Sequence, residues 1–145
     1  MILKISSLIG FGIAVLGLAY LIYNNYIFSS NPITIVIQVS AFTLMVWARF
    51  TFKLRSFHAT AKATKGGLVT TGPYRIFRHP IYAAVIYFVW ASVIAFPRIE
   101  TIIACMLVTG GMFLRMILEE KSLLATYGDY EAYSKRTKRL IPYVF

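Results

Sequence analysis

No charged side chain occurs between residues 5 and 48 of this 145-residue chain. Such a run is about twice the roughly 20 residues that an α-helix needs to cross the hydrocarbon of a bilayer. One polar cluster, from Ser29 to Pro32, interrupts the run and predicts a short loop. We therefore expect two membrane-spanning helices, at about residues 4–24 and 33–52.

A basic connector, at about residues 53–78, separates this pair from two further apolar segments. It contains Thr, Gly and Pro but no sustained apolar run, which is typical of a segment outside the bilayer. A third span is predicted at about residues 79–96, where Pro97 and Arg98 mark a turn.

A fourth span, at about residues 99–118, is the least regular of the predicted spans. Its uncharged part extends only from Thr101 to Leu114, which is short for a crossing. The segment can cross if Arg115 faces protein or a water-filled cavity instead of lipid. In the tail, residues 119–145, tyrosines alternate with charges, which predicts a short amphipathic helix at the membrane interface.

Composition and charge distribution agree with one all-α, polytopic membrane domain over residues 1–145. Charged residues make up 14% of the chain, against about 25% in an average soluble domain. Basic residues gather in the connector and the tail, whereas the opposite loops hold only Arg98, so the positive-inside rule places both termini in the cytoplasm. The net charge of +10 then favours contact with anionic membrane lipids over nucleic acid.

Two features of the spans concern packing. Cys105 is the single cysteine, so an internal disulfide is excluded, and no metal site is predicted. Gly10 and Ala14 form a pair of small residues four apart, which favours close helix packing. The same pair could mediate a dimer, so the sequence leaves the oligomeric state open.

The first cluster of residues that could carry chemistry runs from Gly72 to Tyr82 and has the sequence GPYRIFRHPIY. Pro80 suits the first turn of a helix, so we expect His79 at the membrane end of the third span. Tyr82, three residues on, then shares its helix face. A basic anchor with an interfacial tyrosine explains the same pattern without a functional site.

The second cluster lies at the end of the fourth span, from Arg115 to Glu120. Arg115 and Glu119 are four residues apart, so they share a helix face and can pair. A plain ion pair at a helix end is one interpretation. Adjacent carboxylates beside a bilayer are costly without partners, however, and this favours a polar pocket for a ligand with a cationic group.

Together the two clusters resemble the isoprenylcysteine carboxyl methyltransferase superfamily, whose general design phospholipid N-methyltransferases share. The pattern is Gly-x-Tyr-Arg-x-x-Arg-His-Pro-x-Tyr, followed after about forty residues by Glu-Glu-x-x-Leu-x-x-x-Tyr-Gly-x-Tyr-x-x-Tyr and a basic stretch ending in Ile-Pro. The resemblance covers residues 66–142, whereas residues 1–52 are similar only in being apolar spans.

The resemblance implies a membrane methyltransferase that uses S-adenosylmethionine, leaves S-adenosylhomocysteine as product, and acts on a lipophilic acceptor such as an isoprenylcysteine-type carboxylate. It implies a cofactor pocket formed by the last two spans and the tail. By position, the cofactor-binding residues would be Tyr74, Arg78, His79, Pro80, Tyr82, Glu119, Glu120, Tyr130 and Tyr133.

The resemblance also assigns catalytic residues. Arg115 matches a family arginine that handles the methyl acceptor, and Glu119 could take a proton from an amine acceptor. Arg75 and Arg78, with His79, could meet the carboxylate of the cofactor. Ala84 stands where many relatives have glycine, which would narrow the pocket at that point.

Other classes of protein stay open. A small four-span transporter would be expected to carry a carboxylate deep within a span, but the first three predicted spans contain no acidic residue. A non-enzymatic membrane scaffold is not excluded. Isoprenylcysteine, a phospholipid amine, a quinone-like compound and a small hydrophobic thiol or carboxylate all remain possible acceptors.

Overall fold

The structure is a computed structural model that describes residues 2–52 and 67–142. Its helices are α1 (Ile2–Tyr23), α2 (Pro32–Phe52), the 3-10 helix η2 (Gly72–Arg75), α3 (Pro80–Ala95), α4 (Ile99–Thr126) and α5 (Tyr130–Arg136). Within these residues the chain forms helices and no β-strand, as predicted. The first part of the expected connector, residues 53–66, lies outside the described residues.

Three of the helices are long and apolar enough to cross a membrane, namely α1 from Ile5, α2 and α4. The helix α3 runs beside them but has only 16 residues, or about 24 Å at 1.5 Å per residue. The short element among the four predicted spans is therefore α3, whereas the doubtful fourth span is part of the longest helix, which continues to Thr126.

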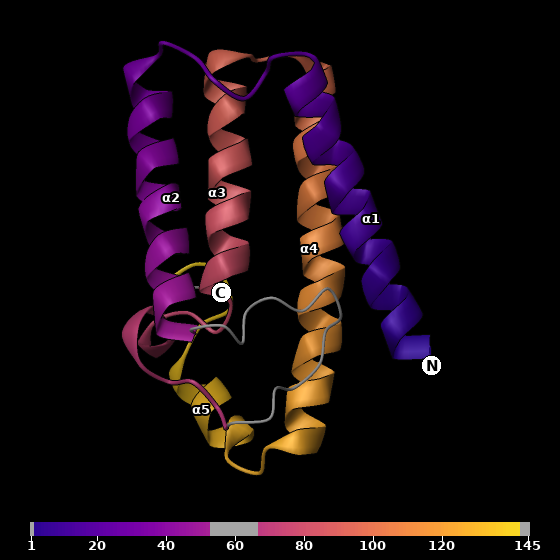
Figure 1. Cartoon of the computed structure of the whole chain (residues 1–145), viewed down its shortest axis with the longest axis vertical. Coiled ribbons are helices and arrows are strands. Elements are labelled where there is room, and N and C mark those ends of the chain that lie inside the picture. Colours follow the sequence, from indigo (N-terminus) through magenta and orange to yellow (C-terminus); the bar gives the residue numbers. More distant parts are fainter. Residues whose placement is uncertain (1, 53–66, 143–145) are drawn as a thin grey trace.

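The four long helices form two packed pairs (Figure 1). The helix α1 packs along α4, α2 packs along α3, and a smaller contact between α3 and α4 joins the pairs. The connections from α1 to α2 and from α3 to α4 lie at one end of the bundle, while η2 and α5 lie at the other. We call the second end the site end. The helix α1 also begins at the site end.

Small residues bring α1 close to α4. A Cβ atom added to Gly10 would lie 2.9 Å from the carbonyl oxygen of Gly111, and one added to Gly17 would lie 2.6 Å from that of Ala104. Ala14 is buried at the same crossing. The face with Gly10 and Ala14 therefore packs against α4 within the chain.

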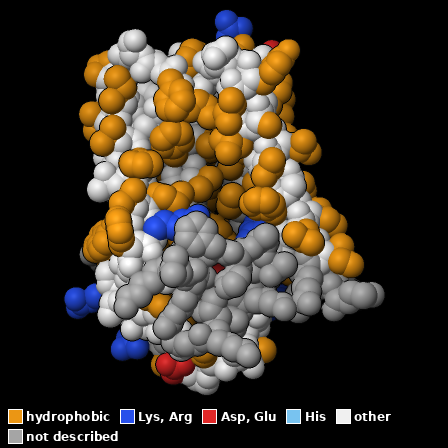
Figure 2. Space-filling model, viewed as in Figure 1, with side chains coloured by type: hydrophobic (Ala, Val, Ile, Leu, Met, Phe, Trp, Pro, Cys, Tyr) orange, Lys and Arg blue, Asp and Glu red, His pale blue; other side chains and the backbone are white. Residues whose placement is uncertain are grey.

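The outer surface of the bundle is apolar, as a lipid-facing surface must be. Hydrophobic side chains cover the helices, and Lys and Arg side chains gather mostly around the site end (Figure 2). Large exposed apolar residues include Leu16, Ile22, Val36, Phe42 and Phe50. The surface therefore agrees with the predicted membrane environment.

The tail returns to the start of α3 and pairs with it. Phe77 and Lys138 form an isolated parallel β-bridge. The Arg78 amide donates to the carbonyl oxygen of Lys138 at 2.6 Å, and the His79 amide donates to that of Arg139 at 3.2 Å. This pairing places the tail next to the predicted His-Pro cluster, although the two segments are far apart in the sequence.

Candidate active site

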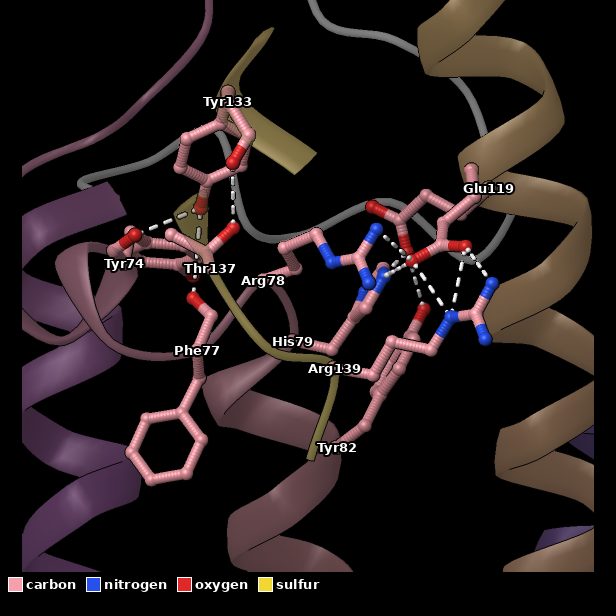
Figure 3. A network of polar contacts seen from close by, with 10 residues as sticks. Tyr74, Phe77, Arg78, His79, Tyr82, Glu119, Tyr133, Thr137 and Arg139 are labelled. Carbon is pink, nitrogen blue, oxygen red and sulfur yellow. Dashed lines mark hydrogen bonds and ion pairs between the residues drawn. The ribbon is translucent and has the colours of Figure 1, made fainter. Parts of the chain in front are cut away.

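Glu120 is the centre of a buried ionic network at the site end. Its Oε1 lies 3.3 Å from Arg78 Nη1 and 3.3 Å from His79 Nε2. Arg139 donates to Oε2 from Nε at 3.1 Å and from Nη2 at 2.9 Å. The residues just before α3 and the tail thus meet at one carboxylate of α4 (Figure 3).

The partners of Glu120 make its burial possible. The residue is 7% exposed, and an isolated charge at that depth would lose several kcal/mol of hydration. The two-pronged contact with Arg139 is the geometry in which a guanidinium binds a carboxylate most strongly. In return, hydrogen bonding to Glu120 raises the pKa of Arg139 above its ordinary value. Glu120 therefore ties the tail to α4.

Glu119 points to a different set of partners. The Tyr82 hydroxyl donates to Glu119 Oε2 at 2.8 Å, and His79 Nδ1 lies 3.8 Å from the same oxygen. The rings of His79 and Tyr82 stack with centroids 5.4 Å apart and planes within 1° (Figure 3). The Glu119 side chain is 26% exposed, against 9% for Glu120, so Glu119 is the more accessible carboxylate.

The local sequence explains why the first cluster adopts this position. Pro80 occupies the first turn of α3, where its missing N–H leaves no carbonyl without a partner, and His79 directly precedes it. Gly72 has φ of +58°, and a Cβ atom there would meet the side chain of Thr51 in α2. Glycine therefore allows η2 to pack on the end of α2 and present the residues that follow.

Three tyrosines build the side of the site formed by η2 and α5. Tyr74, Tyr130 and Tyr133 are all buried, and the Tyr133 hydroxyl donates to the Tyr74 carbonyl oxygen at 2.8 Å. Burial raises the pKa of Tyr133 to about 12. Burial, and next the Glu120 carboxylate, raise the pKa of Tyr130. Tyr130 and Tyr133 therefore remain neutral at physiological pH.

Two buried polar atoms beside the network have no hydrogen-bond partner among the described residues. They are the Tyr130 hydroxyl and Arg78 Nε. Buried polar atoms are normally satisfied, and exceptions are candidates for contact with water or a ligand. Both atoms belong to residues predicted to bind the cofactor.

Arg115 lies one helical turn before Glu119 and is 6% exposed. Its Cζ atom is 5.2 Å from the ring centroid of Phe11 in α1. The charges of Arg115 and Glu119 both act on the Tyr82 hydroxyl. The expected condition for the fourth span is met, because Arg115 is surrounded by protein.

The bundle and its buried polar cluster define an integral membrane protein with a polar site at one end. Comparison with known families identifies the family: the model of the phospholipid methyltransferases, PEMT, matches residues 33–130. The match covers more than half of the chain, so the chain belongs to this family of membrane methyltransferases, and the predicted group is confirmed. The curated proteins and the solved structures contain no match.

The structure brings together most of the residues predicted for the site. Arg78, His79, Tyr82, Glu119 and Glu120 form one network. Tyr130 and Tyr133 lie beside it, with their rings tilted and their centroids 5.9 Å apart, and Pro80 and Ala84 are buried in α3. Arg75 does not join Arg78. It is exposed at an open pocket of about 200 Å³ behind Tyr133, lined by Thr70, Arg75, Tyr133, Arg136 and Thr137.

Arg139, which completes the network around Glu120, and Phe11, which contacts Arg115, were not among the predicted residues. Arg139 is one of several basic residues in the tail, and nothing local distinguishes it from Lys138. Phe11 is one apolar residue in an apolar span. The sequence feature that comes closest to predicting the contact of Phe11 is its neighbour Gly10. A small residue there indicates close helix packing but does not identify the helix it packs against.

Proposed function

We propose that this chain transfers a methyl group from S-adenosylmethionine to a lipophilic acceptor at the edge of the bilayer. Membership of the phospholipid methyltransferase family supports the reaction class. The observation that carries the proposal is the His79–Tyr82–Glu119 arrangement, anchored by Glu120 at the point where α3 begins. At this position a charged cofactor and a lipophilic acceptor could both reach the same site.

The residues present fit the cofactor. S-adenosylmethionine supplies a methyl group activated by a sulfonium, and it also carries an ammonium, a carboxylate and ribose hydroxyls. The accessible Glu119 can accept hydrogen bonds from the ammonium or the ribose. Arg78 Nε and the Tyr130 hydroxyl offer donors that are otherwise unmet. The ring faces of His79 and Tyr82 suit the adenine, and a tyrosine face attracts a cation.

Glu120 has a different role in this proposal from the one expected at first. Its oxygens already contact Arg78, His79 and Arg139, so little capacity is left for a ligand. We assign Glu120 to holding Arg78 and His79 in position, and Glu119 to contacting the cofactor. Two neighbouring carboxylates thereby take separate tasks.

Arg115 and Glu119 would act on the acceptor. A buried guanidinium can bind and orient an acceptor carboxylate or phosphate, and orientation in a dry pocket supplies much of the catalysis of methyl transfer. A carboxylate acceptor needs no general base. An amine acceptor must lose a proton, and Glu119 or His79 could take it. The family description favours a phospholipid amine, while an isoprenylcysteine-type carboxylate remains the alternative.

A transporter is the less favoured function. The helices α1, α2 and α3 carry no Asp or Glu, and Glu100 is exposed in the first turn of α4. The acidic residues of the network lie at the site end instead. A substrate or proton site in the middle of the bundle would need such a group there.

Cofactor binding is the first test. We expect detergent-purified protein to bind S-adenosylhomocysteine saturably in calorimetry and to show a higher melting temperature with it, because a ligand that binds only the folded state stabilises it. Total membrane lipid with a labelled methyl donor should then yield a labelled lipid, which identifies the acceptor. Absence of both heat and thermal shift with either form of the cofactor would exclude the proposed function.

A further inference from the structure

Arg115 is held between α1 and α3. Its Cζ atom lies 5.2 Å from the Phe11 ring centroid on the α1 side. On the α3 side its charge acts on the Tyr82 hydroxyl, which donates to Glu119 at 2.8 Å. Arg115, one turn before Glu119 on α4, therefore contacts Phe11 on one side and lies near the Tyr82–Glu119 hydrogen bond at the proposed cofactor site on the other.

Gly10 makes the contact with α1 possible. A Cβ atom at Gly10 would lie 3.3 Å from Arg115 Cγ and 2.9 Å from the carbonyl oxygen of Gly111. Without that atom, the aliphatic part of Arg115 lies against the backbone of α1. The guanidinium then reaches the ring of the next residue, Phe11.

An aromatic face is a specific partner for a guanidinium in this environment. A charged side chain at membrane depth is costly unless it is paired, and a ring face attracts a cation where an aliphatic side chain only shields it. Phe11 is 42% exposed, so it covers Arg115 while the rest of its ring faces outward from the bundle. Loss of the ring would leave Arg115 buried but less firmly oriented.

We propose that Phe11 is a positioning residue for Arg115, which makes α1 part of the acceptor side of the active site. This inference rests on the proposed role of Arg115 in binding the methyl acceptor. The region matched by the family model begins at residue 33, so it does not include α1. In this protein α1 therefore contributes to methyl transfer as well as to packing.

The test compares three variants in steady-state methyl transfer. Phe11→Leu keeps an apolar side chain and removes the ring face, Phe11→Tyr keeps the face, and Phe42→Leu removes another exposed aromatic ring, on α2. We expect Phe11→Leu to lower kcat/KM for the acceptor about three- to tenfold, the size of one partly desolvated cation–π contact. The Kd for S-adenosylhomocysteine should stay within about twofold of wild type.

Phe11→Tyr should restore kcat/KM to within about twofold, and Phe42→Leu should behave as wild type. Unchanged kinetics of Phe11→Leu in an active protein would overturn this inference alone, as would an equal loss in Phe42→Leu. An inactive wild-type protein would overturn the proposed function together with it.

A second measurement does not depend on turnover. Melting temperatures are compared for Phe11→Leu, Arg115→Gln and the double variant in detergent. If the two side chains interact, the double variant should lose less than the sum of the single losses. Additive losses would show that the ring does not hold the guanidinium and would overturn the inference.

Discussion

His79 stands between the carboxylates of two consecutive residues, with Nε2 toward Glu120 and Nδ1 toward Glu119. Consecutive residues on a helix point about 100° apart, so one imidazole can face both only because it approaches α4 from another element. The two carboxylates differ in their other partners. Glu120 is enclosed by two guanidinium groups. Glu119 accepts a hydrogen bond from the Tyr82 hydroxyl and remains partly exposed.

This difference predicts that substitution of Glu120 lowers stability, whereas substitution of Glu119 lowers cofactor affinity. Glu120→Ala should lower the free energy of unfolding by about 3–5 kcal/mol, because it leaves Arg78 and His79 buried without their shared partner. Glu119→Gln should keep the fold and weaken S-adenosylhomocysteine binding about tenfold, through loss of one charge-assisted hydrogen bond. Chemical unfolding in micelles and calorimetry measure the two effects.

Glu131→Gln is the matched control for this comparison. Glu131 is exposed on α5 and pairs with Lys135 at 2.8 Å, away from the network. It should change neither stability nor binding appreciably. A Glu120→Ala protein with wild-type stability would contradict the structural role of Glu120, and wild-type affinity in Glu119→Gln would remove Glu119 from the cofactor site.

At the scale of elements, the close crossing of α1 and α4 decides where Arg115 lies. Three small residues of α1, Gly10, Ala14 and Gly17, are buried against α4, and the backbones come nearer than larger side chains would permit. In lipid there is little hydrophobic drive between helices, so close packing supplies much of their association. The α1–α4 pair is therefore sensitive to single added carbon atoms.

Alanine substitutions of two glycines in α1 test whether α1 and α4 cross this closely. Gly17→Ala places a Cβ 2.6 Å from the Ala104 carbonyl oxygen, so we expect it to separate the helices and reduce stability by about 1–3 kcal/mol. Gly12 has no atom within 4 Å of an added Cβ, and Gly12→Ala should be neutral or stabilise by up to about 1 kcal/mol. Equal effects of the two changes on the melting temperature would contradict the crossing.

For the whole molecule, the asymmetry between the two ends of the bundle carries the functional argument. The helix α1 begins at the site end, where α5 also lies, and basic side chains gather there (Figures 1 and 2). By the positive-inside rule we propose that the site end faces the cytoplasm. A polar cofactor could then reach Glu119 from water, and an apolar acceptor could approach from the bilayer.

Cysteine labelling tests this orientation. Ser30 lies in the loop between α1 and α2, and Ala132 lies on α5, and both are exposed. A membrane-impermeant maleimide added to intact cells should label Ser30→Cys but not Ala132→Cys, and the pattern should reverse in inside-out vesicles. The native Cys105 is buried and serves as the unlabelled background. The opposite pattern would invert the proposed topology.

The sequence by itself determined the all-helical membrane class, the approximate helices and the two clusters that identify the family. These features depend on local signals: apolar runs of membrane length, a proline at a helix start, and paired residues one turn apart. Even the doubtful fourth span was recognised, although its true length was not. Helix ends beyond the apolar run depend on contacts with other elements, here the partners of Glu120.

Tertiary structure alone decided which residues complete the site. Arg139 reaches Glu120 because the tail pairs with the start of α3, Arg75 turns away to another pocket, and Phe11 meets Arg115 across the α1–α4 crossing. None of these contacts follows from composition or spacing, because each joins elements far apart in the chain. A side chain in a basic tail or an apolar span gains its role only when packing supplies its partner.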